Sequence, residues 1–156
     1  MAKLVLFIIV IAVYVAVGQC LSGSTIAATA DRHIGSTKWA KAASYSTGRN
    51  TWKCNIFVAD VLKEAGGSVP MRKFWFITRG PIGAGEWANP SSSYLTNDRC
   101  WTRTSVASLG VVMGYGGHVG IVTGNRQTTS AAEFQVVKND WGFRSGQNPT
   151  MWKYVC

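Results

Sequence analysis

The stretch of residues 52–67, WKCNIFVADVLKEAGG, carries the clearest secondary-structure signal in the chain. Its apolar side chains recur at the i, i+3, i+4, i+7 and i+8 spacing that lines one face of an α-helix. Asn50 or Thr51 is placed to cap the first turn, and the two final glycines are typical of a helix end. The stretch therefore predicts a helix from about Trp52 to Ala65 with one buried face.

The C-terminal third has a different pattern, in which short apolar segments alternate with glycine-rich turns. This pattern predicts strands at 109–113, 118–123, 128–132 and 134–138, and residues 141–143 and 151–155 are expected to close the sheet. A helix followed by an antiparallel sheet predicts an α+β fold in which the helix packs on the sheet.

The remaining segments give weaker signals. Residues 21–30 are small, and we expect a flexible lead-in. Residues 31–44 fit a rough helical face and predict another helix. From residue 70 to residue 101, aromatic side chains are mixed with Gly, Pro, Ser and Asn, which predicts long loops with one short helix.

The N-terminus resembles a secretory signal peptide. Lys3 precedes an unbroken apolar run of 14 residues, Leu4 to Val17, and small residues follow. A membrane span needs about 20 apolar residues, so the run favours a cleaved signal over a retained anchor. We expect a signal peptide at 1–20, cleaved within a few residues of its end, and a single domain at 21–156 that is secreted, extracellular and without a stable membrane anchor.

The chain is basic, with a formal net charge of +9. A basic secreted domain is attracted to anionic surfaces, of which the bacterial envelope is one. Because the Lys and Arg residues are dispersed and no nucleic-acid motif is present, we do not expect nucleic-acid binding. We expect a monomer.

Export would place the cysteines in an oxidising compartment, where exposed pairs become disulfides. Cys100 with Cys156 is one expected pair, but Cys20 can replace either partner or be removed with the signal. Cys54 is the remaining cysteine, in the first turn of the predicted helix.

Cys54 has features of a nucleophile. The positive end of a helix dipole favours a thiolate, and a cysteine nucleophile also needs a base from elsewhere in the chain. His118 begins a predicted strand, on which it shares a face with Gly120. Because glycine leaves that face open, we expect the helix N-terminus to approach the imidazole there. The alternatives are a buried or disulfide-bonded Cys54 and an unpartnered His118 at a sheet edge.

The motifs WKCNIFVADVL at 52–62 and GGHVGIV at 116–122 together resemble the paired Cys and His motifs of the NlpC/P60 and CHAP peptidases, which are papain-like amidohydrolases. With NDWGFR at 139–144, the chain is also similar to the amidase effectors of bacterial type VI secretion and to their domesticated arthropod copies. The resemblance implies Cys54 as nucleophile, His118 as base, and bacterial peptidoglycan stem or cross-link peptides as substrate.

Members of this family usually carry a third polar residue that orients the histidine. The resemblance places Ser130 in that role, with Asn139 and Asp140 as rivals. Neither a cofactor nor a metal is expected, since the Cys and His are single and far apart in the sequence. Two other functions stay open: a catalytically silent, basic wall-binding module, and a papain-like amidase with a non-wall substrate.

Overall fold

The computed structural model describes residues 20–75 and 77–156. The predicted signal peptide, apart from Cys20, lies outside these residues. Within the described ranges, no helix is both long enough and apolar enough to cross a membrane.

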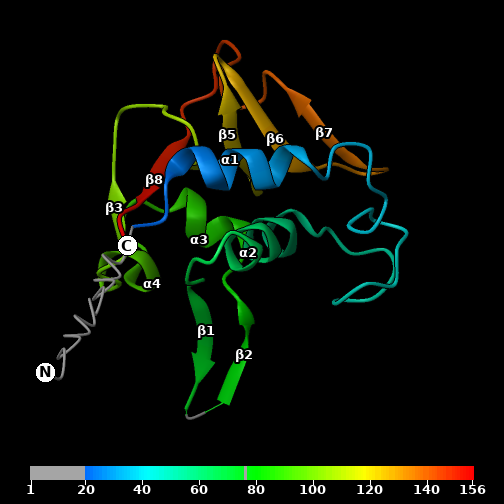
Figure 1. Ribbon diagram of the computed structural model, residues 1–156. Helices are drawn as coiled ribbons and strands as arrows, with labels where there is room; N and C mark the ends of the chain where they lie inside the picture. The colour runs from blue at the N-terminus through cyan, green and yellow to red at the C-terminus, as the bar shows by residue number, and fades with distance from the viewer. Residues whose placement is uncertain (1–19, 76) are drawn as a thin grey trace, which may run out of the picture.

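The domain is built around an antiparallel six-stranded sheet (Figure 1). Its strands run in the spatial order β3-β8-β4-β5-β6-β7, so the C-terminal strand lies inside the sheet. Their bounds are β3 Trp101–Arg103, β4 Val112–Tyr115, β5 His118–Gly124, β6 Gln127–Ala131, β7 Val136–Asn139 and β8 Thr150–Tyr154. The predicted α+β class with an antiparallel sheet is confirmed, although residues 141–143 form no strand and β3 was not predicted.

Helices cover one face of this sheet (Figure 1). The helices α1 (Gly23–Asp31) and α2 (Cys54–Glu64) both pack against β5, and α3 (Ala84–Ala88) packs against β4. The main apolar core fills the space between the helices and the sheet, while a smaller cluster around Met113 covers the opposite face.

The predicted central helix is confirmed as α2. It begins at Cys54, and its N-cap is Lys53, which makes no side-chain capping bond, so the predicted caps Asn50 and Thr51 were wrong. Gly66 follows the helix with φ +92°, the left-handed conformation that glycine adopts without steric cost. The prediction of a single buried face was too narrow: side chains on more than one face of α2 are buried, because both α1 and the sheet contact the helix.

The expectations for residues 21–44 were wrong. Residues 21–30 are not a flexible lead-in: the Ser22 side chain caps α1, and Ile26 and Ala30 are buried in the core. The helix predicted over residues 31–44 is absent: Asp31 ends α1, and residues 32–44 form turns and irregular structure. Trp39 nevertheless anchors this segment, since its buried ring packs edge-to-face on Phe57 and its Nε1 donates a hydrogen bond to Asp60 at 2.9 Å.

The segment expected to consist of long loops is more ordered than predicted. It contains a hairpin of β1 (Met71–Phe74) and β2 (Ile77–Pro81), then α3 and α4 (Ser93–Thr96). The hairpin forms a separate two-stranded sheet that projects from the body (Figure 1).

A disulfide joins Cys100 to Cys156 and fastens the C-terminus to the segment before β3. Cys20 and Cys54 are free thiols, exposed and buried respectively. The expected pair is therefore confirmed, and Cys20 replaces neither partner.

Candidate functional site

Cys54 occupies the first position of α2 and is only 3% exposed. Burial raises the pKa of its thiol, and hydrogen bonds from backbone N–H groups, first that of Val119 on β5, partly oppose this rise. The bond from Val119 places the sulfur beside the start of β5. At neutral pH the resting group is therefore a thiol.

His118 is the first residue of β5. Its Nε2 lies 3.0 Å from the Oγ of Ser130, a buried residue of the neighbouring strand β6. Its ring also packs edge-to-face against Trp141, with ring centroids 4.6 Å apart. Burial lowers the pKa of His118 to about 4, so the imidazole is neutral at neutral pH and can accept a proton.

Cys54 and His118 line one pocket of about 260 Å³, together with Trp52, Gly116 and Gly117. The two glycines form the turn between β4 and β5 and have φ values of +57° and +80°. Both face open space where a Cβ would lie, so this turn adds no side chain to the mouth of the pocket. The sheet and the helix thus present a thiol and an imidazole to the same small cavity.

The route by which the helix reaches His118 differs from the prediction. Gly120 does not open the strand toward α2, since a Cβ there would meet the Cβ of Ser130 at 3.1 Å and the ring of Trp141 at 3.5 Å. Val119, on the opposite face of β5, belongs to the core that includes α2. Side chains alternate between the two faces of a strand, so Val119 faces α2 while its neighbour Gly120 faces away from the helix. Cys54 instead meets β5 at the start of the strand, through the backbone of Val119.

Of the three candidates for the third polar residue, the structure brings Ser130 to His118. The Oδ1 of Asn139 accepts a hydrogen bond from the backbone N–H of Trp141 at 2.9 Å. Asp140 forms an exposed ion pair with Arg144 at 2.7 Å. Both rivals have structural partners in the loop after β7.

Two residues of the site were not predicted as such. Trp141 covers one side of the imidazole, and only its place in the NDWGFR motif pointed to it. Lys53, immediately before Cys54, is 1% exposed, and its Nζ donates to the carbonyls of Ala40, Lys41 and Thr51 at 3.2, 3.3 and 3.0 Å. A lysine in a polar stretch gives no sequence signal of burial, since lysine is almost always exposed.

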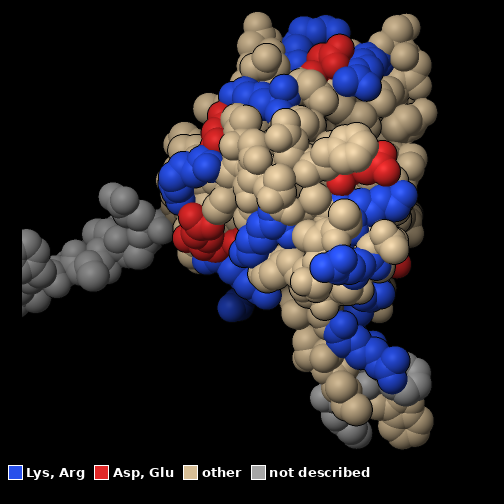
Figure 2. Space-filling model, turned by 90° about the vertical axis from the view of Figure 1, so that its right-hand side faces the viewer, with Lys and Arg blue, Asp and Glu red and all other residues tan. Residues whose placement is uncertain are grey.

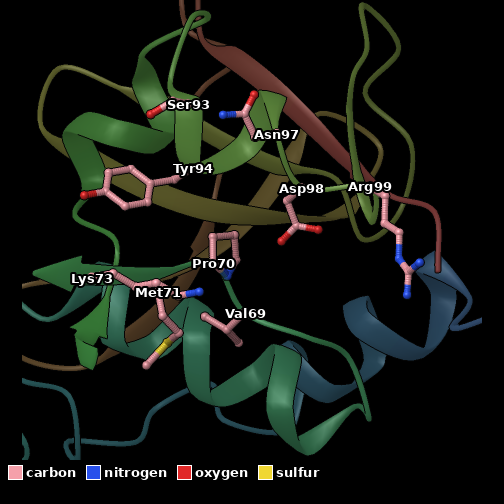
Figure 3. A pocket seen from close by; sticks show the side chains of 9 residues that line it. All are labelled: Val69, Pro70, Met71, Lys73, Ser93, Tyr94, Asn97, Asp98 and Arg99. Carbon is pink, nitrogen blue, oxygen red and sulfur yellow. The ribbon is translucent and has the colours of Figure 1, made fainter. Parts of the chain in front are cut away.

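A larger cavity of about 800 Å³ lies elsewhere, between the base of the hairpin and the α4 region (Figure 3). Its lining residues are Val69, Pro70, Met71, Lys73, Ser93, Tyr94, Asn97, Asp98 and Arg99, which include neither Cys54 nor His118. We take the smaller pocket as the candidate site, because it holds the Cys54 thiol and the His118 imidazole. Trp87 and Trp101, two aromatic residues of the segment 70–101, line neither cavity and are buried against each other.

The site combines a thiol, a neutral imidazole and a hydroxyl that is hydrogen-bonded to the imidazole. Such a set can perform acyl transfer through a thioester. No group of three or more His, Cys, Asp or Glu side chains in the described ranges is arranged to hold a metal ion.

Comparison of the chain with protein-family models, with curated proteins and with solved structures finds no match. The likeness of the Cys54 and His118 motifs to those of NlpC/P60 peptidases therefore stays a resemblance of sequence motifs. What the protein does has to be inferred from the chemistry of Cys54, His118 and Ser130.

Proposed function

We propose that the protein is a secreted cysteine amidase of the papain-like NlpC/P60 type, which hydrolyses peptide bonds in peptidoglycan stem or cross-link peptides. The observation that carries this proposal is the pocket shared by Cys54, at the start of a helix, and His118, which is hydrogen-bonded to Ser130. The peptidoglycan substrate comes from the motif resemblance, and the basic chain suits an anionic wall. The signal-like N-terminus and the disulfide support secretion.

The proposed reaction starts from a neutral pair. His118 uses Nε2 to bond Ser130, which leaves Nδ1 to take the proton of the Cys54 thiol as the sulfur attacks the amide carbonyl. The backbone N–H of Cys54, at the helix start, is a donor for the oxyanion that forms.

Collapse of the tetrahedral intermediate breaks the C–N bond. Protonated His118 gives its proton to the leaving amine, and a thioester with Cys54 remains. His118 then takes a proton from water, whose oxygen attacks the thioester. The new carboxylic acid leaves, and the thiol regains its proton. The Ser130 hydroxyl would hold the ring in one orientation through these steps.

The test is digestion of purified muropeptides by the native protein and by the Cys54→Ala and His118→Gln variants, with products identified by mass spectrometry. We expect fragments from the native protein and none above background from either variant. His33→Gln is the matched control, because His33 pairs with Glu64 at 2.7 Å and does not line the Cys54 pocket. The fragment masses would name the bond that is cleaved.

A catalytically silent wall-binding module is the second candidate. The observation that favours it is the burial of the Cys54 thiol, which raises the pKa and weakens a resting nucleophile. In this case the native protein and Cys54→Ala would bind insoluble peptidoglycan equally, and neither would release fragments.

A further inference from the structure

The β1–β2 hairpin is the most unusual surface of the molecule. It projects beyond α2 (Figure 1), and Lys and Arg side chains lie along the projecting arm in the space-filling view (Figure 2). Between Met71 and Pro81 the sequence contains three basic residues and no acidic one; the basic residues are Arg72, Lys73 and Arg79. All three are exposed, so the hairpin is a cationic arm.

The end of this arm is apolar. The side chain of Trp75 is 81% exposed and that of Ile77 is 62% exposed. Trp75 also adopts φ +55°, a left-handed conformation that costs free energy for a bulky residue. Large apolar side chains are normally drawn into a core, so this arrangement points to a partner that covers the tip.

The base of the hairpin is attached to the body. The backbone N–H of Ile82 donates to the carbonyl of Pro70 at 3.1 Å and closes the hairpin. The Nδ2 of Asn55, the residue after Cys54, donates to the carbonyl of Ile82 at 3.1 Å. The arm is therefore connected to the first turn of α2, next to the candidate active site.

We propose that the hairpin docks reversibly onto an anionic lipid bilayer. Trp75 and Ile77 would enter the interfacial layer, where tryptophan is enriched, while Arg72, Lys73 and Arg79 meet lipid phosphates. An apolar tip flanked by cations fits the boundary between acyl chains and anionic headgroups, whereas a hydrated glycan offers no acyl layer to bury the tip. The contact is peripheral, and it does not depend on the proposed amidase activity.

Docking would also orient the domain. Because Asn55 links the hairpin base to the start of α2, a docked arm would hold the Cys54 end of the helix near the lipid surface. The substrates within reach would then be those at an anionic membrane.

The experiment is co-sedimentation of the purified protein with phosphatidylcholine vesicles that contain or lack phosphatidylglycerol. We expect binding only to the anionic vesicles, with affinity that falls as salt rises. Trp75→Ala should weaken vesicle binding at least roughly fivefold, because the variant loses the favourable transfer of the tryptophan side chain from water into the bilayer interface. Each of Arg72→Gln and Lys73→Gln should weaken it by roughly fivefold, about 1 kcal/mol per basic residue.

Trp52→Ala is the matched control for vesicle binding, since Trp52 is also an exposed tryptophan, at 55%, but lines the Cys54 pocket and is not on the hairpin. It should bind as the native protein does. Cys54→Ala should also bind normally, so loss of amidase activity and loss of docking are distinguishable. Far-UV circular dichroism would show that each variant is folded.

Three results would overturn the proposal. One is equal binding to neutral and anionic vesicles. Another is anionic binding that folded Trp75→Ala and the two charge variants leave unchanged. The third is retention by insoluble peptidoglycan without any binding to vesicles.

Discussion

The Nε2 atom of His118 lies 3.0 Å from the Oγ atom of Ser130, across two neighbouring strands and twelve positions apart in the sequence. The bond engages one ring nitrogen, and the proposed mechanism uses the other for proton transfer. Trp141 packs on the same imidazole, so the ring is held both by a hydrogen bond and by an aromatic contact.

Ser130→Ala should lower kcat/KM on muropeptides by roughly five- to tenfold, because one hydrogen bond contributes about 1 kcal/mol to the orientation of the base. Ser130→Thr keeps the hydroxyl and should restore most of the activity, which a merely structural role would not require. Thr129→Val is the control, since Thr129 is buried on the same strand but bonds Asp31 and Thr123. Equal activity of the native and Ser130→Ala enzymes would contradict the role.

The pH dependence of kcat/KM should be unusual for a Cys-His enzyme. In the proposed mechanism Cys54 and His118 share one proton, which starts on the thiol and moves to the imidazole. Burial lowers the pKa of His118 to about 4. Activity should therefore be flat at neutral pH and fall only as the pH approaches about 4, where His118 becomes protonated and cannot accept the thiol proton. Because burial raises the pKa of Cys54, the alkaline decline should begin above the ordinary range of a cysteine.

The measurement is the initial rate at each pH, with circular dichroism used to confine the profile to conditions where the protein is folded. An acid limb centred near the ordinary histidine value of 6.5 would contradict the buried, neutral imidazole. His33→Gln should leave the profile unchanged, as His33 does not line the pocket.

Lys53→Met should reduce the free energy of unfolding by about 3 kcal/mol, since buried carbonyls that now accept from the Lys53 Nζ would lose this donor. The methionine keeps much of the volume, so the loss reports the hydrogen bonds and not a cavity. Urea denaturation gives the free energy. Lys63→Met is the control: Lys63 is exposed in the last turn of α2, and its change should stay within about 0.5 kcal/mol. Equal urea unfolding midpoints for Lys53→Met and Lys63→Met would show that the hydrogen bonds of the Lys53 Nζ contribute little to stability.

Replacement of Cys100 and Cys156 by serine should destabilise the domain by about 4 kcal/mol, the chain-entropy value for a disulfide that spans 56 residues. The reason is that the cross-link restricts the unfolded chain. Thermal and urea unfolding of the double variant would measure the loss. Cys20→Ser should leave stability unchanged, because Cys20 is an exposed free thiol. A double variant as stable as the native protein would mean that β8 keeps its place without the disulfide.

Much of the secondary structure near the site could be predicted from the sequence. The helix that carries Cys54 has an apolar pattern of period 3.6. The strands that begin at His118 and near Thr128 are short segments rich in β-branched residues and separated by a turn, and both signals are local to the sequence. The α+β class follows from the order of these elements.

Elements whose stability comes from distant partners could not be predicted. The small residues of α1 gave no strong pattern, and the helix is buried because it packs against β5. The β1–β2 hairpin lies among aromatic residues without regular alternation, and its turn contains Trp75 where glycine or asparagine would mark a turn.

From its sequence alone the protein has a thiol at a helix start, a histidine at a strand start, and Ser130, Asn139 and Asp140 as competing partners for that histidine. Only the tertiary structure selects among them: it places Ser130 beside the imidazole and gives Asp140 to Arg144. The reason is physical, since periodicity is a property of neighbouring residues, whereas strand register and the packing of α2 on β5 depend on hydrogen bonds and apolar contacts between distant parts of the chain.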